Sequence, residues 1–160
     1  GSVLLGIFLL IAVGGYVNKK YTMQKEKEVQ LQKRIEEENT EKMEKASNNK
    51  IPSIIISNAK AKQGDKVTIG VSLVNNPGIL GMTLNLSFDD TVLKLTGAEE
   101  GEAFEGILDM NHSKTLENGC VFLWDGENLT TDQIQDGEIL KLEFEVLKNA
   151  PEGKKMKMEQ

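Results

Sequence analysis

The sequence has little of what metal-dependent or nucleophilic catalysis requires, since its 160 residues include one cysteine and one histidine. The single cysteine, Cys120, excludes an internal disulfide. It stands in the apolar stretch CVFLW, so we expect it to be a small buried hydrophobic residue. The histidine, His112, stands in the polar stretch DMNHSK without a plausible catalytic partner. We expect it to be an exposed loop residue.

Sequence motifs for catalysis and ion binding are also missing, including a phosphate-cradling glycine loop and a CxxC pair. Asp89 and Asp90 are adjacent at a predicted strand end, where a turn-forming role is expected. Residues 125–136, DGENLTTDQIQD, superficially resemble a calcium loop. An EF-hand needs an oxygen ligand at its fifth position and glycine at its sixth, where Leu129 and Thr130 stand. We therefore predict no enzymatic activity, no catalytic or metal-binding residues and no cofactor.

Charge is unevenly distributed along this chain of net charge −6. Residues 18–50 carry nine Lys/Arg and seven Glu, whereas residues 51–160 carry ten Lys and eighteen Asp/Glu. The second part has no basic patch interleaved with aromatic residues. Nucleic acid is therefore excluded as a partner, because its recognition depends on clustered Lys and Arg.

An uncharged apolar run, VLLGIFLLIAVGGYV, occupies residues 3–17. As a helix it would span roughly 22 Å, which is less than the bilayer core of about 30 Å unless upstream residues lengthen it. We expect residues 1–18 to be a transmembrane helix, acting as an anchor or signal anchor. The alternative is the hydrophobic region of a signal peptide, with cleavage after Gly14.

A charged segment follows at residues 19–50. It is rich in Glu, Lys and Gln, and its first 28 residues lack Gly and Pro, which favours a helix. Glu38 with Lys42 and Glu41 with Lys45 are favourable pairs on such a helix. We expect a solvated helical stalk that ends before Pro52, with a separate domain at residues 51–160.

Beyond the stalk, the hydrophobic period becomes two, which is typical of an all-β sandwich. The predicted strands are IIISNAKA, KVTIGVSLV, MTLNLSF, VLKLTGA, CVFLW and ILKLEFEVL. In the third of these, the alternation predicts an inward face of Met82, Leu84, Leu86 and Phe88. The outward face is predicted to carry Gly81, Thr83, Asn85 and Ser87. Phe122 and Trp124 are predicted to fill the core.

Several landmarks together resemble the cohesin domain of cellulosomal and related bacterial surface proteins. They lie in AKQGDKVTIGVSLVNNPGILGMTLNLSFDDTVLKLTGAEEGEAF (residues 61–104), CVFLWDG (120–126) and GEILKLEFEVLKNAPEGK (137–154). The resemblance implies a nine-stranded jelly-roll β-sandwich that binds a dockerin, a small helical module. Calcium is expected on the dockerin and not on this chain.

The resemblance also implies where the partner binds. In the family, the third, fifth, sixth and eighth strands present a flat face. The third strand corresponds to GMTLNLSF, the sixth to CVFLW and the eighth to KKMKMEQ, within which the chain stops. We therefore expect a C-terminally incomplete domain. The predicted partner-binding residues are Gly81, Thr83, Asn85, Ser87 and Leu123.

The combined hypothesis is a membrane-anchored module on the bacterial cell surface, with its β-sandwich extracellular. It would cross the membrane once, through residues 3–17, and bind dockerin-containing proteins, either carbohydrate-active enzymes or scaffold proteins. One alternative is a carbohydrate-binding or adhesive sandwich. Another is the extracellular sensor domain of a membrane signalling protein.

Overall fold

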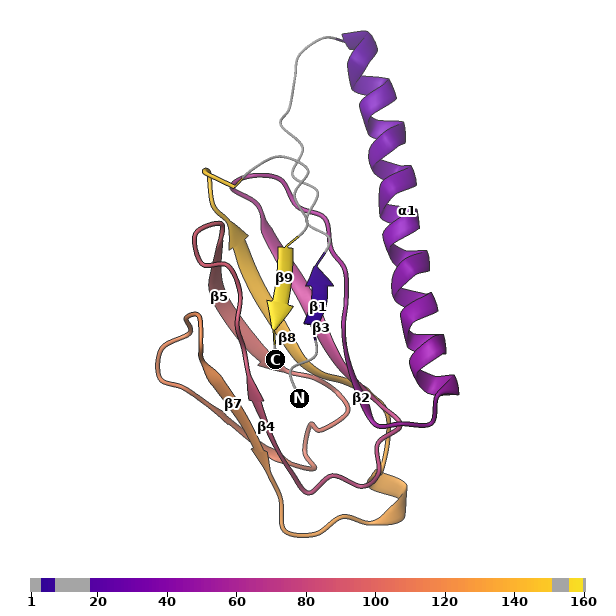
Figure 1. Cartoon of the computed structure of the whole chain (residues 1–160), viewed down its shortest axis with the longest axis vertical. Coiled ribbons are helices and arrows are strands. Elements are labelled where there is room, and N and C mark those ends of the chain that lie inside the picture. The colour runs from indigo at the N-terminus through magenta and orange to yellow at the C-terminus, as the bar shows by residue number, and fades with distance from the viewer. Residues whose placement is uncertain (1–3, 8–17, 151–155, 160) are drawn as a thin grey trace.

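Two antiparallel sheets face each other in the computed structural model, which describes residues 4–7, 18–150 and 156–159 (Figure 1). The larger sheet has the order β2-β3-β8-β5, with bounds Ser53–Ile56, Lys66–Val74, Gly137–Val146 and Leu93–Glu100. The smaller sheet has the order β4-β7-β6, with bounds Gly81–Asn85, Val121–Asp125 and Asp109–His112. The predicted all-β sandwich is confirmed.

One hydrophobic core fills the space between the sheets. Phe122 and Trp124 of β7 are both 0% exposed, as their alternation with polar residues predicted. Aromatic contacts connect the two sheets: the rings of Phe88, just beyond β4, and Phe144, in β8, meet edge to face at 5.1 Å between centroids. Such pairs add stability beyond the area that they bury.

Two details of the smaller sheet differ from the sequence prediction. β4 ends at Asn85, which is earlier than predicted. Beyond it, the backbone still bonds to the residue that precedes β7, with Leu86 N donating to Cys120 O at 2.9 Å. His112 lies in strand β6 and not in a loop, although it is exposed as expected. Its ring lies 5.8 Å from that of Phe122. The sequence did not indicate β6 because this short edge strand lacks a clear apolar alternation.

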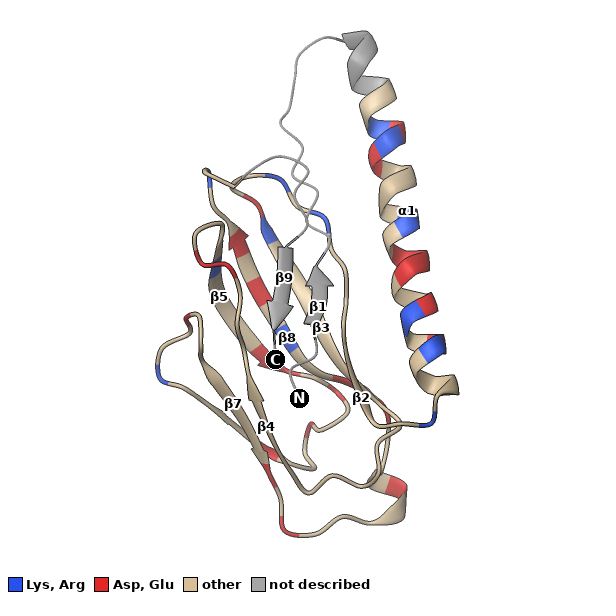
Figure 2. Ribbon diagram, viewed as in Figure 1, with Lys and Arg blue, Asp and Glu red and all other residues tan. Residues whose placement is uncertain are grey.

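The predicted helix is present as α1, Asn18–Asn48, but it is not solvated on all sides as expected. α1 lies along the side of the sandwich (Figure 1) and contacts β2 and β3. Ile35 and Ala46 are 2% and 7% exposed, and they share one helical face with Asn39 and Lys42. This face packs against the domain, whereas most of the Lys, Arg and Glu residues that alternate along the helix lie outside it (Figure 2). The proposed division at residue 51 stays a prediction.

The contact between helix and sheet is centred on Asn58, the one buried polar residue of the described chain. Asn39 Nδ2 donates to Asn58 O at 3.1 Å, and Asn58 N donates to Asn39 Oδ1 at 2.7 Å. The Asn58 side chain accepts from Lys42 Nζ at 2.7 Å and donates to Glu38 Oε2 at 3.2 Å. One helical amide thus bonds the backbone beyond β2 as a neighbouring strand would, which protects this edge of the sheet.

Two further contacts hold α1 at positions away from Asn58. Lys62 forms an ion pair with Glu28 at 2.9 Å, and this lysine is the main reason why the pKa of Glu28 is lowered. Near the other end, Asn75 Nδ2 donates to Ala46 O at 2.8 Å and to Ile51 O at 3.1 Å. The backbone of Asn75 has a φ of 59°, a conformation that asparagine tolerates better than most residues. The helix is therefore bound along much of its length.

The predicted membrane segment, residues 1–18, falls largely outside the described residues. Its described part includes Leu4–Ile7, which forms strand β1 and pairs antiparallel with β9, Met156–Glu159. The prediction of a strand at KKMKMEQ is confirmed by β9, although β9 does not pair with β4. Within the described ranges, no helix has the length and apolar character needed to span a bilayer.

We predict that Asn39→Ala destabilises the domain, because it leaves the buried backbone N–H and C=O of Asn58 without partners. The expected loss is about 1–2 kcal/mol in the free energy of unfolding, after allowing for the better helix propensity of alanine. Chemical denaturation measures it. Gln30→Ala, at an exposed position of the same helix, is the matched control and should change stability by less than about 0.5 kcal/mol. Equal effects of the two substitutions would show that α1 does not dock in solution.

Candidate interaction surface

The outer face of the smaller sheet brings most of the predicted site residues together. Because side chains alternate along each strand, burying Phe122 and Trp124 turns the intervening Leu123 outward. The strand registers define three rows across this face, which we call the β4–β7–β6 face. Its rows are Gly81–Asp125–Asp109, Thr83–Leu123–Asn111 and Asn85–Val121.

Leu123 occupies the middle of the central row, between Thr83 on β4 and Asn111 on β6. It is 43% exposed, which confirms its predicted exposure. Both neighbours are exposed as well. An exposed apolar side chain with polar neighbours is a common feature of protein interfaces.

Gly81, at the start of β4, leaves an open position beside Asp125. A Cβ placed on Gly81 would lie 3.6 Å from Trp124 O, an ordinary van der Waals contact, and its φ is not positive. The fold itself therefore does not require glycine here. A partner can approach the sheet backbone closely at this point.

The remaining predicted residues are placed differently. Asn85 is exposed at the end of β4, opposite Val121 of β7. Ser87 lies beyond the strand end and is half-buried, so it stands at the border of the face. Asp109, Asn111 and Asp125 were missed. Asp125 follows from the same alternation that exposes Leu123, whereas the two β6 residues could not be found without recognising that strand.

Negative charge accumulates at one end of this face (Figure 2). Burial raises the pKa of Glu100, at the end of β5, and the nearby charges of Glu105 and Asp109 raise it further. One of its carboxylate oxygens, Oε1, is buried without a hydrogen-bond partner among the described residues. The carboxylates in this region therefore repel one another, and none of the ion pairs found among the described residues includes Glu100, Glu105 or Asp109.

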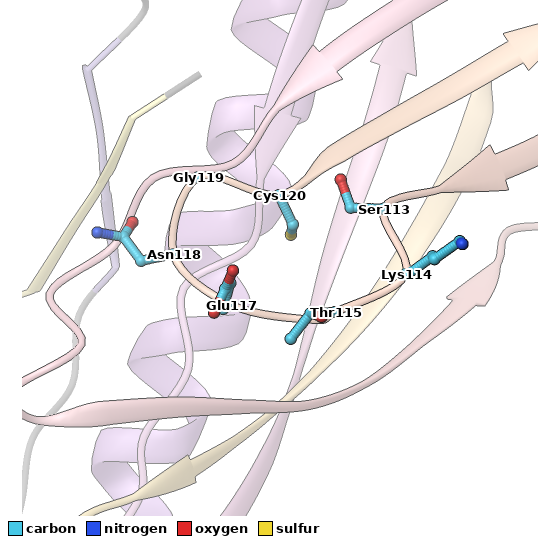
Figure 3. Close-up of a pocket in the computed structure, with 7 residues that line it drawn as sticks. All are labelled: Ser113, Lys114, Thr115, Glu117, Asn118, Gly119 and Cys120. Carbon is cyan, nitrogen blue, oxygen red and sulfur yellow. The ribbon is translucent and has the colours of Figure 1, made fainter.

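A polar hollow of about 250 Å³ lies in the loop between β6 and β7 (Figure 3). Two of its lining side chains already form hydrogen bonds that hold the loop in place. Ser113 Oγ accepts from Val121 N at 2.9 Å, and Asn118 Oδ1 accepts from Phe88 N at 2.9 Å. Cys120 also borders it and is buried and free, as predicted. Burial raises the pKa of its thiol, which keeps it protonated and unreactive.

The carboxylates considered as ion ligands have structural partners. Asp89 forms the turn after β4, where its Oδ1 accepts from Thr91 N at 3.1 Å, which confirms the predicted role. Asp136, at the end of the superficially calcium-like segment, accepts from the backbone N of Asn75 and Asn76 at 2.9 and 2.8 Å. No group of three or more potential metal ligands occurs in the described part of the chain.

Comparison with known proteins identifies the class to which this architecture belongs. Residues 52–160 match the cohesin domain family, and the chain therefore belongs to that family. Cohesins are interaction domains and not enzymes. A comparison with curated proteins found no match.

Solved cohesins share the fold. The sixth cohesin of Acetivibrio cellulolyticus scaffoldin B, solved with a mutant dockerin, is 20% identical with a TM-score of 0.57; the match covers 67% of this chain and 79% of that one. A type I cohesin–dockerin complex from Clostridium thermocellum, containing the OlpC cohesin, is 28% identical with a TM-score of 0.50, covering 61% and 66%. A second such complex from that organism, containing the OlpA cohesin, is 25% identical with a TM-score of 0.51, covering 62% and 75%.

We predict that Glu100→Gln stabilises the domain at neutral pH. The folded state holds the Glu100 proton more tightly than the unfolded chain does, so the ionised form opposes folding once the pH exceeds the raised pKa. Thermal unfolding should show a midpoint a few degrees higher for the variant at pH 7. The difference should shrink as the pH falls toward the ordinary glutamate value of 4.5. Glu102→Gln, at an exposed position nearby, is the matched control, and equal midpoints for the two variants would contradict the prediction.

Proposed function

We propose that this chain is a non-catalytic docking module that binds dockerin-containing proteins through the β4–β7–β6 face. The observation that carries the proposal is the exposed row Thr83–Leu123–Asn111 on the outer side of a cohesin sandwich. Membership of the cohesin family supports the choice of partner. So do the neighbouring structures in which a cohesin is bound to a dockerin.

The rigidity of the sheet explains how such a face would bind. The rings on either side of Leu123 in the chain, Phe122 and Trp124, are fully buried, and β7 is held between β4 and β6. Leu123 is therefore presented without a backbone rearrangement, which lowers the entropic cost of association. Thr83, Asn85 and Asn111 would supply hydrogen bonds around it, with Gly81 admitting the partner to the backbone. Calcium would be carried by the dockerin, where it holds that module in its folded form.

Attachment to the membrane and the cell surface is the wider part of this proposal. We infer that residues 3–17 anchor the protein, on the basis of their uncharged apolar run. The complete domain would be a nine-stranded jelly roll outside the cell, and its cargo would be carbohydrate-active enzymes or scaffold proteins. The carbohydrate-binding alternative gains no support from Trp124, because its ring is buried in the core.

Fractionation of cells that produce the protein tests the anchor. We expect the full chain in the membrane fraction, resistant to extraction by high salt, and a variant lacking residues 1–17 in the soluble or secreted fraction. A cleaved signal peptide would instead give a shortened mature protein, beginning at Gly15, that is released without detergent. That result would contradict the anchor but not the docking function.

Calorimetric titration against a panel of dockerins, with calcium and then with excess chelator, tests docking. We expect calcium-dependent binding that Leu123→Ala weakens by about tenfold or more, the effect of removing a central interface residue. Thr83→Ala should weaken binding, whereas Thr68→Ala, at an exposed position of β3 in the other sheet, is the matched control and should not. Asn85→Asp should also weaken binding. The proposal is wrong if the folded domain binds no dockerin, or if Leu123→Ala and Thr68→Ala bind equally well.

A further inference from the structure

An amine, a carboxamide and a carboxylate meet where α1 packs against the edge of the larger sheet. Lys42 Nζ donates to the side-chain Oδ1 of Asn58 at 2.7 Å, and Asn58 Nδ2 donates to Glu38 Oε2 at 3.2 Å. These are the groups needed to form an amide bond between two side chains: a nucleophile, an acyl carbon and an acid–base group. Glu38 and Lys42 are one helical turn apart, so both reach the same carboxamide from one face of the helix.

The amine lies close to the carbon that it would attack. Because a C=O bond is about 1.23 Å long, Lys42 Nζ is at most about 3.9 Å from Asn58 Cγ. Atoms poised to react are about 3–3.5 Å apart, so a small side-chain movement brings this nitrogen to the carbon. Asn58 itself is held in place, since Asn39 bonds both its backbone N–H and its backbone C=O. The carbon is therefore fixed while the flexible lysine approaches it.

The surroundings favour the reactive form of the lysine. Asn58 is buried and Lys42 is half-buried, and Ile35 and Ala46 are buried on the same helical face. Burial lowers the pKa of Lys42, and the nearby charge of Glu38 opposes this shift without cancelling it. A lower pKa increases the fraction of free amine, which is the nucleophilic form.

The next pair along the helix shows what an ordinary arrangement looks like. Glu41 and Lys45 have the same spacing, and they form an exposed ion pair at 3.1 Å. No hydrogen bond between their side chains and a carboxamide is found in the described part of the chain. The combination of burial and a bound carboxamide thus distinguishes Glu38 and Lys42 from a neighbouring pair of the same composition.

We propose that Lys42 and Asn58 become joined by an isopeptide bond, with Glu38 transferring the protons. The neutral Lys42 Nζ attacks Asn58 Cγ, and Glu38 accepts a proton from the attacking nitrogen. Glu38 then passes this proton to Nδ2, the bond between Cγ and Nδ2 breaks, and ammonia leaves. An amine and a primary amide thus become a secondary amide and ammonia, which requires no oxidant, reductant or cofactor. The reaction occurs once in each chain, so it is a self-modification and not an enzymatic turnover.

The bond would fasten α1 to the larger sheet, and this inference does not rest on the proposed docking function. It would close a loop between residues 42 and 58, which stabilises a fold as other cross-links do. It would also transmit force directly between α1 and the sheet, bypassing residues 43–57. A pull between the proposed membrane anchor and a partner on the β4–β7–β6 face would run through this connection.

The mass of the purified full chain tests the proposal. We expect the wild-type protein to be lighter than its sequence mass by one ammonia, about 17 Da. Glu38→Gln, which cannot carry the proton, and Lys42→Arg, which stays protonated, should both have their full sequence masses. Glu41→Gln and Lys45→Arg, in the exposed pair of the same spacing, are the matched controls and should lose ammonia as the wild type does.

Proteolysis locates the bond. Tryptic mapping of the wild type should yield one branched peptide that joins Lys42 to Asn58. Limited cleavage at Lys50, which is exposed between α1 and β2, should leave the two pieces joined on a denaturing gel. In Lys42→Arg, the same cleavage should release them as separate bands.

Two results would overturn the isopeptide bond. One is a wild-type chain that keeps its full sequence mass even after prolonged incubation at about pH 9, where more of the lysine is neutral. The other is a loss of ammonia that persists in Lys42→Arg, because it would then arise elsewhere, for example by succinimide formation at Asn118–Gly119. None of these measurements involves a dockerin, so a failure of the docking function would leave this test unaffected.

Discussion

The burial of Phe122 and Trp124 is the constraint on which the rest of the structure depends. Both rings are fully enclosed, and Trp124 meets Phe104 at 6.0 Å between ring centroids. Since β7 is the central strand of the smaller sheet, fixing its inward side chains also fixes its outward ones and the rows that β4 and β6 complete. The burial is complete enough that the indole Nε1 has no hydrogen-bond partner among the described residues. Burying this N–H group without a partner is unfavourable, and the packing of the two rings has to outweigh that cost.

The helix solves a different problem, the exposed edge of the larger sheet. Unpaired backbone groups at the edge of a sheet invite pairing with other chains. Here the Asn39 amide takes both backbone groups of Asn58, and Lys42 satisfies the same residue's side chain. Because α1 contacts β2 and β3, which belong to the larger sheet, its docking leaves the outer face of the smaller sheet open. One side of the domain is closed by its own chain, and the candidate binding face is on the other sheet.

Sequence-based prediction succeeded where packing leaves a regular alternation of apolar residues, and it failed where the contacts are polar or exposed. Core strands such as β3, β4, β7 and β8 alternate clearly, so their positions, the sandwich and the exposure of Leu123 could be predicted. β6 is a short edge strand whose side chains are mostly exposed, and it leaves no such pattern. The docking of α1 was missed because its contact is largely polar: Asn39 and Asn58 find each other across 19 residues, which neither helix propensity nor hydropathy indicates. The role of the binding residues stays a prediction.

Stability and the proposed recognition differ in what they require at Gly81. For the isolated domain, a side chain at this position would be tolerated, because a Cβ would make only an ordinary contact with Trp124 O at 3.6 Å and the φ of Gly81 is not positive. A partner on the proposed face would benefit from the missing side chain, because its absence lets another molecule approach the sheet backbone closely. The fold therefore does not account for this glycine, whereas the proposed docking function would.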